Sequence, residues 1–467
     1  METELKKRNT FSNSIGFVLA AAGSAVGLGN IWRFPYLAAK NGGGLFILIY
    51  IIFALTFGFT LLVSEVAIGR KTQESPLTAY KKINSKWGFL GIFSYVVPFI
   101  IYPYYCVIGG WVIKYMVTFI TFQGKTAVDS AFFGGFITGS WQPIVFTLIF
   151  AACCFVIVYK GVEKGIEKIS RILMPILAVL VIFISIYSIF LKHTDAEGVT
   201  RTGLQGWAIY FKPSFEGITL GKFLKICLEA IGQLFYSLSI AMGIMVAYGS
   251  YMKKEENLVK SVNKIEIFDT GIALLAGLMI IPAVFVFVGP SGLEKAGPGL
   301  IFNILPVVFD SMGVFGQIIG IIFFVTVFFA ALTSAVSILE AITSSMIDKF
   351  GWSRKKATLV MAAAGFIVSI IVCLGYNVLA FSVTFATVNG GQILDILDYV
   401  SNNLLMPIIG IFTCVLIGWV AKPKYVIDEV KLNGEKFGRE KLYVVMIKFI
   451  TPVLLLFLLL SSFGMFK

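Results

Sequence analysis

The sequence reads Gly23-Ser24-Ala25-Val26-Gly27-Leu28-Gly29-Asn30 near the middle of its first long apolar segment, residues 14–36. This segment is long enough to cross a bilayer. A glycine inside a helix costs about 1 kcal/mol relative to alanine, so three glycines within seven residues predict a break in the helix. Unwound backbone is tolerated at membrane depth only where it is buried in protein or lines a polar cavity. Because Asn30 and the cation Arg33 follow, the break predicts a binding site for an ion or a small solute.

The composition is that of an integral membrane protein. Of the 467 residues, 58% are hydrophobic and 13% are charged, and the mean hydropathy is +0.90. These values exclude an ordinary soluble domain. Apolar runs predict an all-α polytopic protein with about eleven transmembrane helices. The predicted spans lie near residues 14–36, 44–69, 89–121, 143–159, 166–191, 222–250, 265–289, 316–347, 357–375, 393–420 and 442–465.

The net charge of +13 reflects membrane topology and not a nucleic-acid partner. Every second predicted loop is basic, which is the positive-inside pattern of a multi-pass protein of the plasma membrane with a cytoplasmic N-terminus. An odd number of spans then places the C-terminus outside. The basic residues of these loops are Lys6, Lys7, Arg8, Arg70, Lys71, Lys81, Lys82, Lys86, Lys160, Lys164, Lys168, Arg171, Lys253, Lys254, Lys260, Lys264, Lys349, Arg354, Lys355 and Lys356.

Other classes of protein find little support. All six cysteines fall in apolar spans without a CxxC pair, which indicates neither a disulfide framework nor a zinc site. The one histidine, His193, lies in a predicted outer loop, so a histidine metal site or catalytic triad is excluded. With no HExxH or GxSxG motif, an enzyme is disfavoured. A channel is disfavoured as well, because no span carries a repeated charged or hydroxylated face.

A second interruption divides the chain into similar halves. The predicted sixth span contains Ser237-Leu238-Ser239-Ile240-Ala241-Met242-Gly243, a run of small and polar residues. Interrupted helices at matching places of two inverted five-span halves indicate a transporter with its site at the membrane midplane. We expect one transporter domain over residues 1–467, with repeats at about 11–191 and 221–420 and an extra C-terminal helix at about 441–465. The longest connections are 192–221, 290–315, which we expect to be a packed lid loop, and 421–439.

These motifs resemble the neurotransmitter:sodium symporter family, and its bacterial amino-acid branch in particular. Residues 23–35, GSAVGLGNIWRFP, resemble the first-span signature of that family nearly letter for letter. Residues 41–44 (NGGG), 232–239 (GQLFYSLS) and 330–334 (AALTS) resemble further family blocks in the same order. The resemblance covers essentially the whole chain, which ends after eleven predicted spans where many members have twelve.

The resemblance implies the inverted-repeat fold of the bacterial leucine transporters and the uptake of an amino acid coupled to sodium entry. The coupling is physically reasonable, since each cation moving inward gains about 2.3 kcal/mol per 100 mV. A sensor of the same fold that binds without turnover, or a symporter for another small amine or zwitterion, remains an alternative. A monomer would suffice for function.

The resemblance also implies two sodium sites, since hard cations take oxygen ligands. The first would use Ala25, Asn30, Ser237 and Asp269 together with the substrate carboxylate. The second would use the carbonyls of Gly23, Val26 and Ala330 with the hydroxyls of Thr333 and Ser334. Alternatively, both hydroxyls bond back to carbonyls of their own helix.

Asp269 departs from the asparagine that much of the family has at this position. An aspartate in an apolar span is expensive to bury and is a functional candidate by default. Its negative charge would offset the cation, so we expect no chloride requirement.

For an amino-acid substrate, half-helix N-termini would supply donors to the carboxylate, and unwound carbonyls would accept from the ammonium group. The carboxylate would bind the amides of Leu28 and Gly29 and the Tyr105 hydroxyl, and the ammonium the carbonyls of Ala25, Tyr236 and Ser237. The side-chain pocket would comprise Ile101, Ile108, Phe235, Tyr236, Ser239, Met242 and Ile338. Such residues are ordinarily helix packing. As a pocket they would suit a neutral hydrophobic or aromatic amino acid.

The same resemblance implies gates on both sides. Arg33 and Asp398 would form the outer gate, with Tyr105 and Tyr236 closing over the substrate. Arg8 and Asp348, supported by Tyr251 and Phe11, would close the cytoplasmic side, although topology alone also accounts for Arg8. Gly165 and Pro175 would permit unwinding of the fifth span, or Pro175 is simply a tolerated kink. Glu65, Glu229 and Glu340 are intramembrane carboxylates to which we assign no ligand role.

Overall fold

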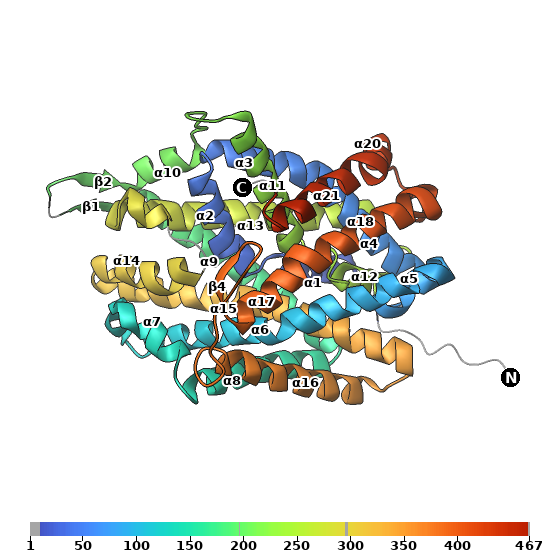
Figure 1. The fold of residues 1–467 in the computed structure, drawn as a ribbon, viewed down its shortest axis with the longest axis horizontal. Coiled ribbons are helices and arrows are strands. Elements are labelled where there is room, and N and C mark those ends of the chain that lie inside the picture. The colour runs from blue at the N-terminus through green and yellow to red at the C-terminus, as the bar shows by residue number, and fades with distance from the viewer. Residues whose placement is uncertain (1–9, 196, 295–297, 466–467) are drawn as a thin grey trace.

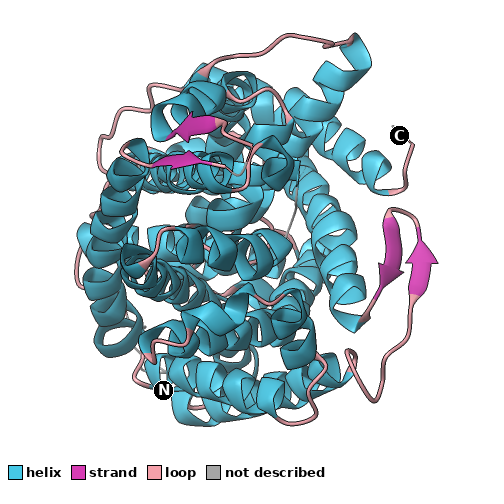
Figure 2. Ribbon diagram, turned by 90° about the vertical axis from the view of Figure 1, so that its left-hand side faces the viewer, coloured by secondary structure: helices cyan, strands magenta, loops and turns pink. Residues whose placement is uncertain are grey.

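The fold of the protein comes from a computed structural model, which describes residues 10–195, 197–294 and 298–465. The long helices run side by side along one axis, horizontal in Figure 1. Strands form two small hairpins at the periphery, β1 (Lys192–Thr194) with β2 (Thr200–Thr202) and β3 (Val383–Phe385) with β4 (Val388–Gly391) (Figure 2). The architecture is therefore an all-α bundle, as the hydropathy pattern predicts.

Helices supply nearly all of the bundle. The first ten are α1 (Ser14–Ala25), α2 (Phe34–Lys40), α3 (Gly44–Phe53), α4 (Phe59–Thr72), α5 (Pro76–Ile83), α6 (Gly88–Ile120), α7 (Ser130–Ile137), α8 (Gln142–Tyr159), α9 (Lys168–Ile189) and α10 (Gly203–Phe211). The others are α11 (Leu220–Ser237), α12 (Ile244–Gly249), α13 (Leu258–Phe287), α14 (Leu305–Ser311), α15 (Val314–Phe350), α16 (Arg354–Leu374), α17 (Ile393–Asp398), α18 (Met406–Val415), α19 (Lys424–Val430), α20 (Glu440–Val445) and α21 (Thr451–Ser462). Short π-helical segments join α3 to α4, α17 to α18 and α20 to α21 into longer continuous helices.

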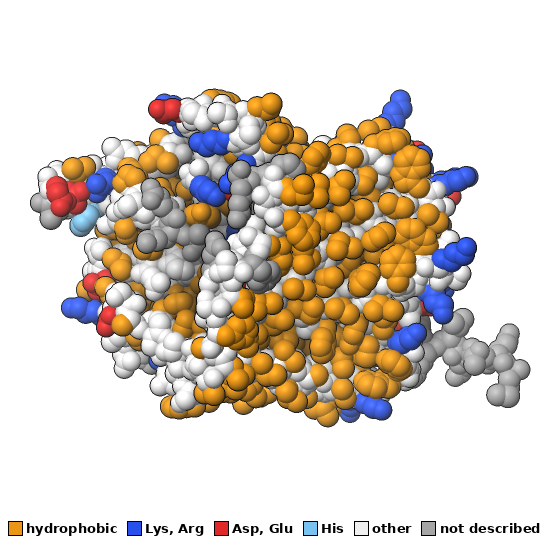
Figure 3. All heavy atoms as spheres, in the orientation of Figure 1, with side chains coloured by type: hydrophobic (Ala, Val, Ile, Leu, Met, Phe, Trp, Pro, Cys, Tyr) orange, Lys and Arg blue, Asp and Glu red, His pale blue; other side chains and the backbone are white. Residues whose placement is uncertain are grey.

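Most of the eleven predicted spans are present as long apolar helices. In the part of the chain that the structure describes, nine helices are long and apolar enough to cross a membrane. The bent pair Ser14–Ala25 and Gly29–Lys40 makes a tenth. The predicted sixth span corresponds to α11 and α12, which a non-helical segment separates. Apolar side chains are exposed along the last helix, and Figure 3 shows a broad apolar surface on this side of the molecule, as expected for contact with lipid.

The first predicted break is confirmed. Helix α1 ends at Ala25, Val26 has extended backbone, and a π-helical turn, Gly29–Arg33, leads into α2 at an angle of 55° to α1. The bent backbone packs closely against neighbouring side chains, and Gly27 and Gly29 leave room for them because they lack a Cβ. A Cβ at Gly27 would lie 2.8 Å from the Ser334 hydroxyl, and a Cβ at Gly29 would lie 2.8 Å from the Tyr236 ring.

The second predicted break is confirmed as well. Helix α11 ends at Ser237, and α12 starts at Ile244. Between them Ser239, Ala241 and Gly243 all have positive φ, at 54°, 61° and 71°. Left-handed backbone at two non-glycine residues is costly and persists only where the surroundings fix it. The two interruptions share the interior of the bundle with α6, α13 and α15 (Figure 1).

The connections carry more order than the sequence suggests. Segment 290–315, expected as a packed lid loop, contains α14. Segment 192–221 contains the first hairpin and α10, whose Tyr210 hydroxyl donates to the Leu274 carbonyl at 3.0 Å. The possible unwinding site between Gly165 and Pro175 is helical, because a π-helical turn, Val162–Glu167, runs directly into α9.

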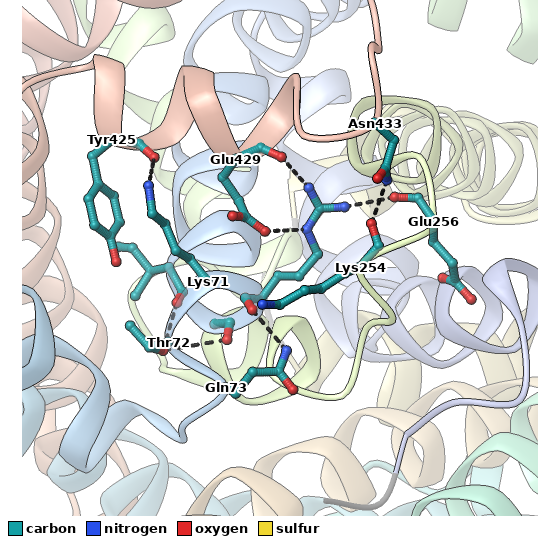
Figure 4. A network of polar contacts seen from close by, with 11 residues as sticks. Lys71, Thr72, Gln73, Lys254, Glu256, Tyr425, Glu429 and Asn433 are labelled. Carbon is teal, nitrogen blue, oxygen red and sulfur yellow. Dashed lines mark hydrogen bonds and ion pairs between the residues drawn. The ribbon is translucent and has the colours of Figure 1, made fainter.

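Segment 421–439 is fastened to the bundle through a buried arginine (Figure 4). The fully buried Arg70, at the end of α4, donates from Nε to Oε1 of Glu429 at 2.7 Å and from Nη1 to the Glu256 carbonyl at 2.7 Å. Beside it, Lys71 donates to the Tyr425 carbonyl at 2.8 Å. These contacts join α4, α19 and the loop before α13 at one end of the bundle.

Candidate functional site

The two broken helices enclose a small pocket in the middle of the bundle. The free volume of this pocket is about 20 Å³, which is room for about one water molecule. Its walls come from α1 and the following turn, α6, α11 with its broken end, and α15. The lining residues are Ser24, Ala25, Gly27, Gly29, Asn30, Ile101, Tyr105, Tyr236, Ser237, Ser239, Met242, Ser334 and Ile338. Most of the predicted substrate residues therefore meet at one place.

The predicted ligands of the first sodium ion also converge. Nδ2 of Asn30 donates to Oδ1 of Asp269 at 2.7 Å and to the Ser237 hydroxyl at 3.0 Å. The Ser237 hydroxyl in turn donates to the same carboxylate oxygen at 2.6 Å. Asn30 and Asp269 are fully buried. The Asp269 carboxylate is thus buried and accepts hydrogen bonds from polar groups, none of which is basic. The cluster is therefore electronegative and suits a cation.

Tyr50 on α3 belongs to the same cluster, although no sequence pattern pointed to it. Its hydroxyl donates to the second carboxylate oxygen of Asp269 at 3.5 Å. Tyr50 is fully buried and packs edge-on against Phe34, with ring centroids 4.8 Å apart. From the sequence, a tyrosine in an apolar span is expected to be a packing residue. Only the folded structure shows the contact of its hydroxyl with Asp269.

At the predicted second sodium site, one hydroxyl faces three carbonyls. The Ser334 hydroxyl lies 3.3 Å from the carbonyl oxygen of Gly23, 3.0 Å from that of Ser24 and 3.2 Å from that of Val26. Thr333 instead donates to carbonyls of its own helix, Phe329 at 2.9 Å and Ala330 at 3.2 Å. The structure thus brings Gly23, Val26 and Ser334 together, while Thr333 has the internal hydrogen bonds of the alternative interpretation.

Polar backbone groups of both breaks surround the pocket. The Leu28 amide donates to the Tyr105 hydroxyl over 3.4 Å, a long contact. The Ser239 hydroxyl donates to the Ser24 carbonyl at 3.1 Å and so ties one broken helix to the other. Unwound backbone of this kind offers amides to an anion and carbonyls to a cation within one small volume.

Glu65 stabilises the second break. Its Oε1 accepts from the Ala241 amide at 2.7 Å, at one of the left-handed residues. Glu65 lies on α4 and is almost fully buried. Its carboxylate therefore satisfies backbone that the helix interruption leaves unpaired, a positioning role consistent with its having no predicted ligand role.

Two residues of the predicted side-chain pocket, Phe235 and Ile108, lie elsewhere. The Phe235 side chain packs against Gly410 and Phe57 and not against the pocket. Its ring lies 3.1 Å from the position that a Cβ at Gly410 would have, and its ring centroid lies 6.1 Å from that of Phe57. Ile108 is buried but does not line the pocket. Leu28, predicted through its amide alone, meets the pocket by that amide, which contacts the Tyr105 hydroxyl.

A larger cavity of about 880 Å³ adjoins the pocket between α11, α18 and α21. Tyr236 lines both spaces, and Arg33 lines the larger one. The predicted outer gate is not a direct ion pair in the described chain. Asp398 accepts from Asn402 at 2.6 Å and interacts with Arg33 only at longer range.

At the opposite end, a buried ion pair joins α15 to α16. Glu340 accepts two hydrogen bonds from Arg354, at 2.7 and 2.9 Å, and one from the Tyr251 hydroxyl at 2.6 Å. Asp348 accepts from the Ser75 amide at 2.6 Å. The amide of Phe11 donates to the Tyr251 carbonyl at 3.1 Å. Arg8, the predicted partner of Asp348, lies outside the described residues.

Glu229 has a structural role that the sequence did not predict. Its carboxylate accepts from Lys40 at 3.0 Å and from Asn41 at 2.5 Å. These contacts fasten the end of α2 to α11, so the two half-helices on this side of the pocket are joined by an ion pair.

Comparison with known proteins agrees with this geometry. The family model described as "Sodium:neurotransmitter symporter family" matches residues 8–128 and 138–467. The "Uncharacterized sodium-dependent transporter YhdH" of Bacillus subtilis (strain 168) is 35% identical over 464 residues, which cover 97% of each chain. The human "Sodium- and chloride-dependent GABA transporter 2" is 24% identical over 91% of this chain and 75% of its own length.

A solved structure has the same fold. The "Crystal structure of MhsT in complex with L-phenylalanine" superimposes with a TM-score of 0.84 at 35% sequence identity, covering 98% of this chain and 100% of the other. Family match, relatives and fold are all those of transporters and not of enzymes. The chain belongs to the sodium:neurotransmitter symporter family and is a multi-span, sodium-dependent membrane transporter.

Proposed function

We propose that the protein imports a neutral, hydrophobic or aromatic L-amino acid together with about two sodium ions, by alternating access across the plasma membrane. One observation carries the proposal. Asp269, Asn30 and Ser237 form a buried electronegative cluster at the edge of a pocket bounded by both broken helices. The N-terminus would be cytoplasmic and the C-terminus outside, and the two five-helix halves would be inverted repeats.

The first sodium ion would take the place that the Asn30 amide hydrogens now occupy. Nδ2 of Asn30 touches the Ser237 hydroxyl, the Asp269 carboxylate and, at 3.4 Å, the Asp269 carbonyl. Three oxygens around one positively polarised group suit a hard cation once the amide turns its oxygen inward. Ala25 and the substrate carboxylate would complete the site. Because Asp269 supplies the negative charge, chloride would not be required.

The second sodium ion would bind where the Ser334 hydroxyl hydrogen now faces three carbonyls. Ala330 and Thr333 would complete the shell after small side-chain rotations. Sodium entry down its gradient and the membrane potential would drive the substrate inward.

The apolar part of the lining supports the choice of substrate. Ile101, Met242 and Ile338 line the pocket with apolar side chains, while Tyr105 and Tyr236 lie near the Gly27–Gly29 backbone. L-phenylalanine is the ligand named for the MhsT structure, which has the same fold. A charged side chain would find no partner on the apolar wall and would lose its hydration there.

Access to the pocket would be controlled at both ends. Tyr236 would separate the pocket from the larger cavity, and Arg33 would approach Asp398 to close the outer side. Tyr251 and Asp348, with Arg8, would hold the cytoplasmic side closed.

The test is substrate binding by the purified protein across the twenty amino acids, first in sodium and then with potassium replacing it. We expect sodium-dependent binding of hydrophobic or aromatic amino acids. Met242→Ala should shift the preference toward the largest side chains, while Met245→Ala, buried outside the pocket, should leave the order unchanged. Binding that ignores sodium would contradict the proposal. Binding without sodium-driven accumulation in vesicles would identify a sensor.

A further inference from the structure

A second polar pocket lies away from the transport site. It has a volume of about 550 Å³ and lies between the start of α13 and segment 431–439, at the end of the bundle predicted to face the cytoplasm. Three cations, Lys260, Lys436 and Arg439, line it together with one carboxylate, Glu435. The remaining lining residues are mostly polar or small. The lining therefore carries an excess of positive charge.

The pocket is a fixed feature, because both ends of segment 431–439 are anchored. At one end Asn433 donates to the Lys254 carbonyl at 2.5 Å (Figure 4). At the other end Arg439 donates to the Leu55 carbonyl at 2.8 Å, lies 3.2 Å from a Glu266 carboxylate oxygen and stacks on the Phe59 ring, 3.4 Å from its centroid.

Two of the cations remain available to a ligand. In the described chain the ammonium groups of Lys260 and Lys436 have neither a hydrogen bond nor an ion pair, and both side chains are exposed. By contrast, the nearby Lys431 pairs with Glu440 at 2.5 Å. Lys260 interacts with Glu435 only through space.

Apolar surface begins directly beside these cations. Ile267 lies two helical turns from Lys260 along α13 and is 68% exposed. Leu55, whose carbonyl accepts from Arg439, is 47% exposed, and Ile52 is 50% exposed. Such side chains on membrane-spanning segments face lipid tails, so the pocket lies where the lipid-facing surface meets the aqueous side.

We propose that this pocket binds the phosphate headgroup of an anionic phospholipid, with Lys260 and Lys436 as its principal cationic ligands. The acyl chains would lie along the exposed apolar side chains of α13 and of residues 52–55. Basic pockets at the cytoplasmic ends of transmembrane helices suit such headgroups, and anionic lipids concentrate in that leaflet. A soluble phosphate would use the cations but not the adjoining apolar surface. The proposal does not depend on which substrate is transported.

The experiment is native mass spectrometry of the protein purified in dodecyl maltoside and mixed with dioleoyl phosphatidylglycerol. The wild type should retain this lipid, and Lys260→Gln with Lys436→Gln should lower its apparent affinity at least about tenfold. The matched control is Lys81→Gln with Lys86→Gln, which removes two exposed lysines from the connection between α4 and α6, predicted to face the same side. It should retain the lipid as the wild type does. Glu435→Gln should increase retention, which gives a second test with the opposite sign.

Three results would overturn the proposal. Equal loss of lipid from both double variants would show a general charge effect. If wild type and the Lys260/Lys436 variant retain dioleoyl phosphatidylcholine equally, and wild type binds phosphatidylglycerol no more tightly than phosphatidylcholine, then the headgroup charge is not recognised. Displacement of phosphatidylglycerol by millimolar inorganic phosphate would identify a site for soluble anions instead. Thermal unfolding of each variant verifies that the fold is intact.

Discussion

The side-chain amide of Asn30 donates a 2.7 Å hydrogen bond to the Asp269 carboxylate across 239 positions of sequence. Asn30 follows the break after α1, and Asp269 lies inside the unbroken helix α13. Both side chains are fully buried. The broken helix is thus fixed to an intact one at the place where the proposed first sodium ion would bind.

Replacing Asp269 by asparagine should weaken sodium binding. The variant keeps the size of the side chain but removes the formal negative charge that offsets the cation. We expect the sodium concentration for half-maximal substrate binding to rise about tenfold, which corresponds to about 1.4 kcal/mol. Sodium titration of substrate binding measures the shift.

The matched control for this charge removal is Glu216→Gln, since Glu216 is exposed in the connection before α11. It should leave the sodium titration unchanged. An unaltered titration for Asp269→Asn would show that this carboxylate is not a sodium ligand and would remove the main support for the proposed first site.

Replacing Ser334 by alanine should affect the second proposed sodium ion. The hydroxyl faces three carbonyls of the broken helix, and its loss removes both a ligand and a contact between α15 and that helix. We expect a severalfold weaker sodium dependence and a lower Hill coefficient in sodium-driven uptake into vesicles. Ser345→Ala is the control, because that hydroxyl is also buried on α15 but bonds only to Ala341 of its own helix. Identical uptake curves for both variants would exclude the site.

The positions of both helix breaks could be predicted from the sequence, because glycine clusters and small polar residues act locally on the backbone. Asp269 could be identified because a carboxylate in an apolar span is conspicuous. Tyr50 and Glu65 could not, since a tyrosine contact or a carboxylate that caps a distant break has no local pattern. Their roles arise from packing between helices.

The direction in which each side chain points could not be predicted from the sequence either. The family block around residues 232–239 marks the half-helix but does not say which of Phe235 and Tyr236 faces the pocket, and the structure selects Tyr236. The state of a gate is a third limit. Whether Arg33 reaches Asp398 depends on how the half-helices are placed at a given moment, and one sequence encodes every state of the transport cycle.

Breaking the buried pair of Arg354 and Glu340 should destabilise the fold. Glu340 has no exposed side-chain surface, so Arg354→Met leaves a buried charge without its cation at a cost of about 3 kcal/mol. Adding Glu340→Gln should recover much of the loss. Thermal unfolding in detergent, followed by intrinsic fluorescence, measures the Tm of each variant.

The pair of Lys82 and Glu74 is the control for this experiment. Nζ of Lys82 lies 3.0 Å from Oε1 of Glu74. Because the Lys82 side chain is 55% exposed and that of Glu74 is 29% exposed, solvent screens this pair, and Lys82→Met should change stability by no more than about 0.5 kcal/mol. Equal effects of the two substitutions would mean that the pair at Glu340 is not buried in solution.

The stability of the loop before α13 should depend on pH through Glu256. Burial raises the pKa of its carboxyl from the usual 4.5 to about 6, with Glu167 and Glu255 also raising it and Lys253 and Arg70 opposing them. Between these two values the folded state binds more protons than the unfolded state, so stability rises as the pH falls through this range and is lost as it rises.

Glu256→Gln cannot titrate and should lack this contribution. Because the side chain is half-exposed, screening by solvent reduces the difference between wild type and variant to about 1 kcal/mol across the range. Tm values measured from pH 4 to pH 7.5 test it, with the exposed Glu216→Gln as control. The wild-type curve should fall relative to that of Glu256→Gln as the pH rises toward about 6, since deprotonation then places an unfavourable charge beside the anchored segment. Parallel curves would mean that the carboxyl is solvated and that Arg70 holds the loop through the Glu256 backbone alone.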